Sequence, residues 1–371
     1  MNEDLLTLLA AALFQVPCNI AVTDAIRAEA ATQAVSGLIE PDFADLRQNM
    51  RVLHEHLGLH KLLSAAGIPY VILKGYASAS YYPDPMRRSL GDVDFLVPEN
   101  EIDRAAGVLT AAGYELFDDT HPRHLEYRHN GVVSELHWQV NGIPSGAAGE
   151  AAKKYISTMI PEAVCKKIEG EELMLPSDFH HGLICLLHII SHMTSSGMGL
   201  RHLCDWAVFV NWIEDFPAMF QTCFEEIGIW EFAKQLTAVC CRYLGLPDKS
   251  WTGEYPPEFL EAILNDIMDA GNFGRKKEDR YSRVLLDNVE NDGIAAKNSI
   301  LSAMFRNMFG AVKRRWPISK KYPILLPFLW VYVCLRYAWR VLTGKRKRVS
   351  RKTFAEADRR KKLYRQFKLF E

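Results

Sequence analysis

Two acidic residues stand two positions apart in the segment Gly91–Val97, which reads GDVDFLV. The apolar residues around them predict a strand. Side chains alternate between the two faces of a strand, so Asp92 and Asp94 share one face. Carboxylates this close repel each other unless a cation lies between them. Because hard divalent cations prefer oxygen ligands, we predict a Mg²⁺ (or Mn²⁺) site here.

A third acid, Glu135, lies in the segment Val132–Trp138, which also predicts a strand. If the two strands are neighbours, three carboxylates converge. This is the arrangement that two-metal phosphoryl or nucleotidyl transfer needs, because one ion activates the attacking hydroxyl and the other neutralises charge on the leaving pyrophosphate. His137 shares the face of Glu135 by the same alternation. Three roles stay open for it: a neighbour of the metal, a base, or a packed histidine.

Upstream of the acids, Lys74 and Gly75 join a predicted strand, Tyr70–Leu73, to a helix. Glycine lets the backbone approach a phosphate closely, and a helix N-terminus offers free N–H groups. We therefore expect Lys74, Gly75 and Ser78 to contact a nucleotide.

Two further pairs of basic residues are candidates for nucleotide contact. Arg87 and Arg88 directly precede the acid pair, where one of them is placed to hold a triphosphate. His188 and His192 lie one turn apart in a predicted helix, and we expect them to line the cleft towards the nucleotide. The alternatives for this pair are polar groups satisfied between helices, or a zinc site that includes Cys185.

The predicted elements indicate an α+β fold: a small mixed-sheet domain, then an all-helical domain and a basic C-terminal tail. The sheet domain combines strands over 70–73, 93–97, 114–117, 124–128 and 132–140 with helices to 67, from 77 and over 99–112. Asn130-Gly131 is a hairpin turn signal, and 141–149 resembles a loop. The later helices are expected over 179–193, 200–213, 216–227, 231–244 and 258–268.

These elements divide the chain into four segments. We expect N-terminal helices packed on the catalytic domain (1–66), the α/β domain (67–165), the helical domain (170–310) and a basic, aromatic-rich C-terminal segment (311–371).

The net charge of −1 conceals an asymmetry. Residues 311–371 carry 19 Lys and Arg against 3 Asp and Glu, whereas the preceding 310 residues carry 25 against 42. The basic segment suggests an anionic membrane surface, RNA, or no partner at all if its helix packs on the second domain. Residues 322–335 contain no charge, but a membrane span needs about 20 residues, so we expect none.

The composition, 49% apolar and 24% charged, excludes a wholly disordered chain, a collagen-like repeat and a polytopic membrane protein. The acidic N-terminus does not resemble a signal peptide, and the eight cysteines are scattered. We therefore expect a cytoplasmic protein that can lie against the inner face of the membrane.

A set of short motifs resembles the polymerase-β-type nucleotidyltransferase superfamily, and within it an uncharacterised bacterial family often found near surface-polysaccharide genes. These motifs are Leu73-Lys74-Gly75, Tyr82-Pro83, Arg87, Asp92-Val93-Asp94 and Glu135-Leu136-His137-Trp138. The resemblance implies that Asp92 and Asp94 bind metal, that Glu135 is the third carboxylate and that Gly75 is the turn glycine. Tyr76 departs from the second small residue usual at that turn.

The resemblance also implies an activity: transfer of a nucleoside monophosphate from an NTP such as ATP to a hydroxyl acceptor, with release of pyrophosphate. The acceptor stays open between a small molecule, a sugar, a protein and RNA. Two alternatives remain, a non-catalytic nucleotide-binding or scaffold protein at a membrane surface and a tRNA-directed, toxin-like nucleotidyltransferase.

Overall fold

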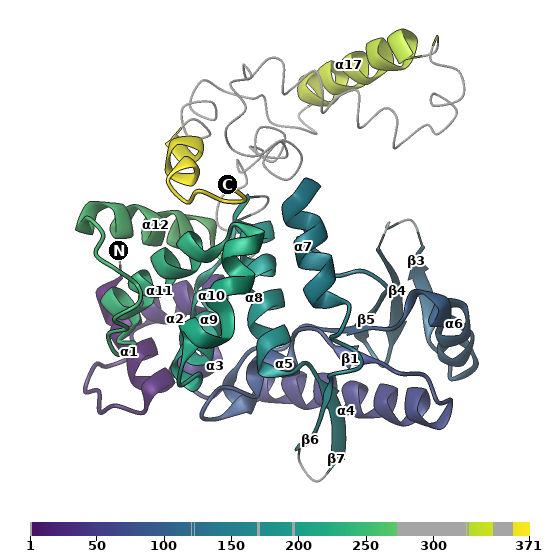
Figure 1. Ribbon diagram of the computed structural model, residues 1–371, viewed down its shortest axis with the longest axis horizontal. Coiled ribbons are helices and arrows are strands. Elements are labelled where there is room, and N and C mark those ends of the chain that lie inside the picture. Colours follow the sequence, from purple (N-terminus) through teal and green to yellow (C-terminus); the bar gives the residue numbers. More distant parts are fainter. Residues whose placement is uncertain are drawn as a thin grey trace.

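The computed structural model describes residues 2–119, 121, 123–168, 171–194, 197–272, 324, 326–343 and 359–371. Among these residues a five-stranded sheet and its helices occupy one side of the molecule, and a larger group of helices occupies the other (Figure 1). The strands are β1 (Val71–Ile72), β2 (Asp92–Leu96), β3 (Glu115–Asp118), β4 (His124–His129) and β5 (Val132–His137), with a separate hairpin of β6 (Val164–Ile168) and β7 (Glu171–Leu175). The α+β prediction is confirmed.

The sheet has the order β1-β2-β5-β4-β3, and its only parallel pair among the described strands is β2 with β5. In this pair Asp94 lies opposite Glu135. The predicted turn between β4 and β5 is confirmed. Asn130 and Gly131 have φ values of 49° and 74°, the left-handed conformation that a tight hairpin turn requires.

The long helix α4 (Phe43–Ala65) covers the sheet. It begins at Asp42, whose side chain accepts a hydrogen bond from the Ala44 amide and so caps the helix. Its buried residues Val52 and Leu63 join one apolar cluster with Phe95 of β2. The other helices next to the sheet are short: α5 (Tyr76–Ala79), the 3₁₀ turns η1 (Pro85–Arg87) and η2 (Glu99–Glu101), and α6 (Ile102–Ala111).

The second and larger apolar cluster lies among helices. Its members come from α1 (Glu3–Phe14), α2 (Asp24–Gln33), α3 (Ser36–Ile39), α8 (Asp178–Thr194), α9 (Leu200–Trp212), α10 (Phe216–Ile227), α11 (Trp230–Leu244) and α12 (Pro257–Ala270). The five predicted later helices are thus confirmed, with ends that agree to within two residues.

The packing of the N-terminal helices differs from the expectation for residues 1–66. Only α4 packs on the sheet, whereas α1 contacts α9 and α11. The reason is the spacing of Leu5, Leu9 and Leu13, which forms one buried stripe along α1. That stripe extends the helical cluster.

Two elements were not predicted. The helix α7 (Gly146–Ile156) begins inside the expected loop 141–149 and contacts α10. The β6–β7 hairpin lies in the region between the two predicted domains, and its Leu173 and Leu175 are buried against the sheet cluster.

The C-terminal end of the chain, within the basic segment expected over 311–371, is part of the helical cluster. Residues 359–371 bury Tyr364 and Phe367 completely. Tyr364 Oη lies 2.7 Å from the Met193 carbonyl oxygen and 2.8 Å from Asp266 Oδ2. Arg360 Nε lies 3.0 Å from Asp266 Oδ1, so this basic residue forms a buried ion pair rather than a solvated charge.

Candidate active site

Three carboxylates converge at the parallel pair of strands. Asp92 and Asp94 come from β2 and Glu135 from β5, and one oxygen of each lies within 4.8 Å of the others. Alternation along β2 places its two acids on one face, and the register of the pair places Glu135 beside Asp94. Asp94 is almost fully buried, whereas Asp92 and Glu135 are partly accessible. The cluster therefore lies at the edge of the core.

Two basic side chains hold Asp94 in place. Lys74 Nζ lies 2.9 Å from Asp94 Oδ1, and His137 Nε2 lies 2.9 Å from the same oxygen and 3.0 Å from Glu135 Oε2. His137 thus bridges two of the acids. Of the three roles considered for it, the structure shows a buried histidine that is also a neighbour of the proposed metal ligands.

The pKa shifts at this site follow from the competition between burial and charge. Burial alone would lower the pKa of Lys74, but the neighbouring carboxylates outweigh it and raise this pKa. Burial also opposes a charged His137, and its hydrogen bonds to the two acids again prevail, so its pKa is raised. For Asp94 burial would raise the pKa, yet Lys74 and His137 lower it far below its usual range.

The pKa of Asp92 shifts in the opposite direction. Repulsion from Asp94, together with burial, raises the pKa of Asp92. The lysine and the histidine that compensate Asp94 thus leave part of the negative charge of the cluster uncompensated at its accessible side.

The residues fit a hard divalent cation. Three carboxylates supply the oxygen donors that Mg²⁺ or Mn²⁺ takes. The raised pKa of Asp92 shows an excess of negative charge that such an ion would relieve.

The predicted phosphate turn lies directly beside the acids. Gly75 has φ +61° and ψ −107°, and it leads from β1 into α5. A side chain there would meet the Asp92 carbonyl oxygen at 3.4 Å and His56 Nε2 at 3.5 Å. Glycine is therefore favoured by its backbone conformation and by the closeness of β2. Ser78 lies in α5 and is buried.

The two arginines before the acid pair are engaged elsewhere. Arg87 Nε donates to the Gly37 carbonyl oxygen at 2.9 Å. Arg88 is buried and forms two hydrogen bonds of 2.7 Å to the carboxylate of Asp205 on α9. Tyr82 donates a third to the same carboxylate, also at 2.7 Å. The structure thus does not place either arginine on the acid cluster.

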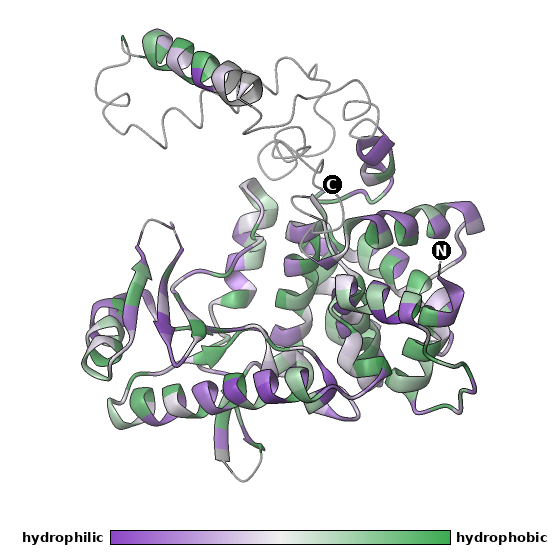
Figure 2. Ribbon diagram, turned by 180° about the vertical axis from the view of Figure 1, so that it is seen from behind, coloured by the Kyte–Doolittle hydropathy of each residue, from purple (hydrophilic) through white to green (hydrophobic). Residues whose placement is uncertain are grey.

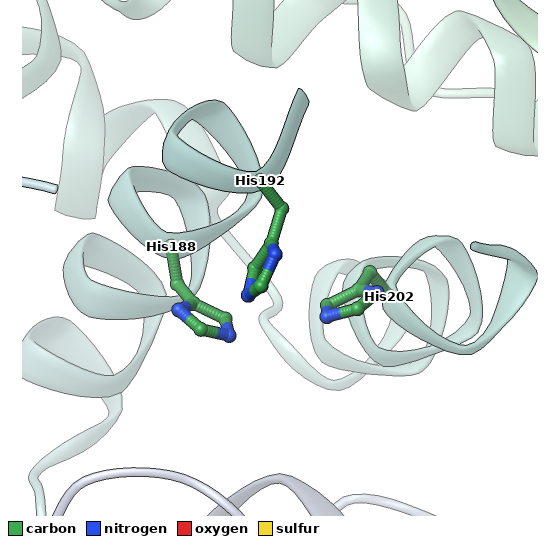
Figure 3. A group of neighbouring side chains, drawn as sticks. All are labelled: His188, His192 and His202. Carbon is green, nitrogen blue, oxygen red and sulfur yellow. The ribbon is translucent and has the colours of Figure 1, made fainter. Parts of the chain in front are cut away.

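His188 and His192 lie together on α8, and the rings are 4.3 Å apart between centroids. His202 of α9 lies next to both of them (Figure 3). Ile184, one turn before His188 on the same helix, packs in a cluster with Leu73 of the segment that leads to Lys74. The middle of α8 therefore packs near the segment that leads to Lys74.

Sequence reasoning missed several residues around the acids. His124 is the cross-strand partner of His137, and its Nδ1 lies 3.7 Å from Glu135 Oε2. His121 stacks on the His124 ring at 3.8 Å. Burial, with smaller contributions from the neighbouring histidines, lowers the pKa of His124 to about 4. The local signal was the alternation along His124–His129, which places His124 on the face of the acids once β4 pairs with β5.

Comparison with known proteins gives one family. The model of a family described as uncharacterised nucleotidyltransferase matches residues 38–245. Similar solved structures include an antigenic nucleotidyltransferase-like protein from Paracoccidioides brasiliensis, with 16% identity and a TM-score of 0.34 over 56% of this chain and 95% of that one. They also include ANT(2″)-Ia in complex with adenylyl-2″-tobramycin, with 14% identity and a TM-score of 0.27 over 52% and 98%. No curated protein matches the sequence.

Proposed function

The chain belongs to the uncharacterised nucleotidyltransferase family, and we propose that it transfers a nucleoside monophosphate from an NTP to a hydroxyl acceptor and releases pyrophosphate. The observation that carries this proposal is the convergence of Asp92, Asp94 and Glu135 beside the Lys74–Gly75 turn. These acids are the proposed ligands of Mg²⁺ or Mn²⁺. When bound, such an ion supplies Lewis-acid chemistry: it polarises phosphoryl oxygens and makes an attacking hydroxyl more acidic.

The protein side chains have their own tasks in this proposal. Lys74 keeps its positive charge because its pKa is raised, so it can both hold Asp94 and attract a phosphate oxygen. Gly75 gives the backbone of the turn room beside β2, where we propose that the triphosphate lies with Ser78 nearby. His137 fixes the positions of Asp94 and Glu135 relative to each other, because its ring nitrogen faces both.

The experiment that tests this function follows the label of the nucleotide. Protein is incubated with each of the four NTPs, labelled at the α-phosphate or at the γ-phosphate, together with Mg²⁺ or Mn²⁺ and a cell extract. We expect the α-label to appear on one acceptor and the γ-label in pyrophosphate. Labelled sugar, small molecule, protein or RNA identifies the acceptor class. Transfer of the γ-label to an acceptor would contradict the proposed reaction.

The decisive variant is Asp92→Asn. We expect it to abolish transfer of the α-label without loss of thermal stability, because the carboxylate that it neutralises is repelled by Asp94 in the folded chain. The matched control is Asp103→Asn, which removes an exposed acid on α6 and should keep wild-type activity. Transfer by Asp92→Asn at the wild-type rate would refute the role of the acids.

A second feature supports contact with an anionic membrane surface. In α17 (Leu326–Leu342) the side chains of Phe328, Leu335 and Trp339 are 65–72% exposed. With Val331 and Tyr332 they form one stripe, because they recur at steps of three and four residues. Figure 2 shows this helix as largely hydrophobic. None of the described helices has the length and hydropathy to cross a bilayer.

The charge around α17 favours lipid as the partner. Arg336 and Arg340 lie within the helix, and Lys345–Arg348 follow it in the sequence as four consecutive basic residues. An apolar stripe flanked by basic residues is typical of helices that lie in the interface of an anionic membrane, where each Lys or Arg contributes about 1 kcal/mol. We propose that this segment holds the enzyme at the inner face of the membrane.

Vesicle binding by the full chain tests this. Cosedimentation with phosphatidylglycerol-containing vesicles should exceed that with pure phosphatidylcholine, and the double variant Phe328→Glu/Leu335→Glu should reduce it at least tenfold. Phe43→Glu is the control, since Phe43 is 85% exposed on α4 and should not matter. Equal binding by the double variant, or binding of tRNA in place of vesicles, would contradict the assignment.

A further inference from the structure

Three histidines converge where α8 meets α9. His188 and His192 come from consecutive turns of α8, and His202 comes from the first turn of α9 (Figure 3). The ring centroids of His192 and His202 are 4.9 Å apart, and those of His188 and His202 are 5.6 Å apart. One ring nitrogen of each histidine lies within 4.8 Å of the other two.

The positions of these rings are fixed by the helices that carry them. His188 and His192 share one face of α8 because four residues separate them. The start of α9 is held by Gln33, whose Oε1 accepts a hydrogen bond from the Leu200 amide at 3.0 Å. Gln33 also donates to the Met268 carbonyl oxygen at 3.0 Å, so the first turn of α9 is tied to α2 and α12. The cluster is thus built on rigid elements rather than on a loop.

The nitrogens are spaced for a tetrahedral ion. Zinc binds imidazole nitrogen at about 2.0–2.1 Å, which places the ligand nitrogens of a tetrahedral site about 3.3 Å apart. The three ring nitrogens already lie within 4.8 Å of one another, so the cluster is compact enough to converge on one ion. Three histidines and one open position are also the ligand set of several zinc enzymes.

The chemical state of the histidines agrees with this geometry. Burial, and then the neighbouring histidines, keep the pKa values of His188 and His202 well below the usual range. Imidazole binds a metal ion in its neutral form. The charges of Lys74 and Arg201 also act on His188. These cations repel a bare divalent ion, so an ion held there needs an anionic fourth ligand to offset them.

We propose that His188, His192 and His202 bind one divalent transition-metal ion of the Zn²⁺ class, separate from the carboxylate site. The donor sets differ in kind, since imidazole nitrogen suits Zn²⁺ and carboxylate oxygen suits Mg²⁺. The fourth position is left for an anionic oxygen, because the cations Lys74 and Arg201 lie near enough to act on His188. This last point rests on the proposed function: a phosphate oxygen of the nucleotide is the ligand that the site would meet, and through it His188 and His192 would contact the nucleotide.

Metal binding by the full chain tests the site without reference to activity. Metal-free protein is titrated with Co²⁺, whose visible absorption reports tetrahedral coordination, and Zn²⁺ is then added as a competitor. We expect one tetrahedral Co²⁺ per chain and its displacement by one equivalent of Zn²⁺. His192→Gln and His202→Gln should each weaken binding at least about 100-fold, more than the 10–100-fold typical of losing an outer-shell partner.

Two controls separate this site from others. His181→Gln changes another buried histidine of α8 that lies outside the cluster and should leave the Co²⁺ spectrum unchanged. Glu135→Gln disables the carboxylate site and should also leave it unchanged, so the zinc site can stand even if the proposed transfer reaction fails. Loss of the tetrahedral spectrum in Glu135→Gln but not in His192→Gln would overturn the proposal. So would wild-type protein that binds neither ion, or histidine variants that are folded and bind Co²⁺ as wild type does.

Discussion

Replacement of Arg88 by methionine should destabilise the whole chain rather than act on the nucleotide alone. The guanidinium of Arg88 and the carboxylate of Asp205 are both buried, with exposed side-chain fractions of 6%, and they share two hydrogen bonds of 2.7 Å. Burial would raise the pKa of Asp205, but Arg88 lowers it, so the carboxylate stays charged. Arg88→Met leaves that charge buried with one fewer cation.

The magnitude follows from the cost of an uncompensated charge. Breaking a buried ion pair by removal of one partner costs about 3–5 kcal/mol. Asp205→Leu should cost a similar amount, since it leaves the guanidinium unpaired and removes the acceptor of the Tyr82 hydroxyl. In the double variant both members of the pair are gone, and its main cost is the lost acceptor of Tyr82, about 1–3 kcal/mol. The coupling energy between the two positions should therefore be at least about 3 kcal/mol.

Urea unfolding of the wild type, both single variants and the double variant measures this cycle. Tryptophan fluorescence can follow the unfolding, since the eight tryptophans include Trp206, which is fully buried beside Asp205 in the sequence and donates from Nε1 to Thr237 Oγ1 at 2.9 Å. An Arg88→Met protein within 0.5 kcal/mol of the wild type, or single-variant costs that simply add, would refute the reasoning. If Arg88→Met lost nucleotide affinity but kept wild-type stability, Arg88 would instead be assigned to binding of the triphosphate.

Two further predictions concern the helical part of the molecule. Burial lowers the pKa of His181 to about 3 from an ordinary 6.5, so the stability that neutral His181 contributes is present above pH 6.5 and is lost as the pH falls towards 3. From this group alone, the free energy of unfolding at pH 5 should be about 2 kcal/mol below that at pH 7. His181→Phe should remove this part of the pH dependence when unfolding by urea is measured at both pH values. Tyr364→Leu should lower the free energy of unfolding by about 1–3 kcal/mol, because it removes a buried hydroxyl that faces Asp266 and the Met193 carbonyl oxygen. A melting temperature equal to that of the wild type would show that residues 359–371 do not pack on the helices as described.

The arrangement of the two β2 acids was predictable because its determinants are local. Alternation along one strand places Asp92 and Asp94 together whatever the rest of the chain does. The contribution of Glu135 needed one further assumption, that β2 and β5 are neighbours, and this pairing crosses about forty residues of sequence. The turn glycine was likewise local, since a strand followed by Lys74-Gly75 and a helix already restricts the backbone.

The contacts that were missed depend on tertiary packing. The Arg88–Asp205 pair joins residues 117 positions apart, so no spacing rule reveals it. His202 lies on a different helix from His188 and His192, and only the packing of α8 against α9 brings it to them. The basic composition of the last sixty residues favoured a solvated tail. Composition could not predict that Arg360 forms a buried ion pair with Asp266, because it carries no information on tertiary contacts.

The charges at the acid cluster explain how three carboxylates coexist there before any substrate arrives. Lys74 and His137, both with raised pKa values, supply up to two positive charges against three negative ones. They compensate the buried member, Asp94, because desolvation makes an unpaired charge most costly there. The remaining repulsion falls on Asp92, the acid at the accessible side. The fold thus places its unrelieved negative charge on the side that ligands can enter and its compensating cations around the buried acid. This is the arrangement that the proposed divalent cation, together with the polyphosphate of the proposed substrate, would neutralise.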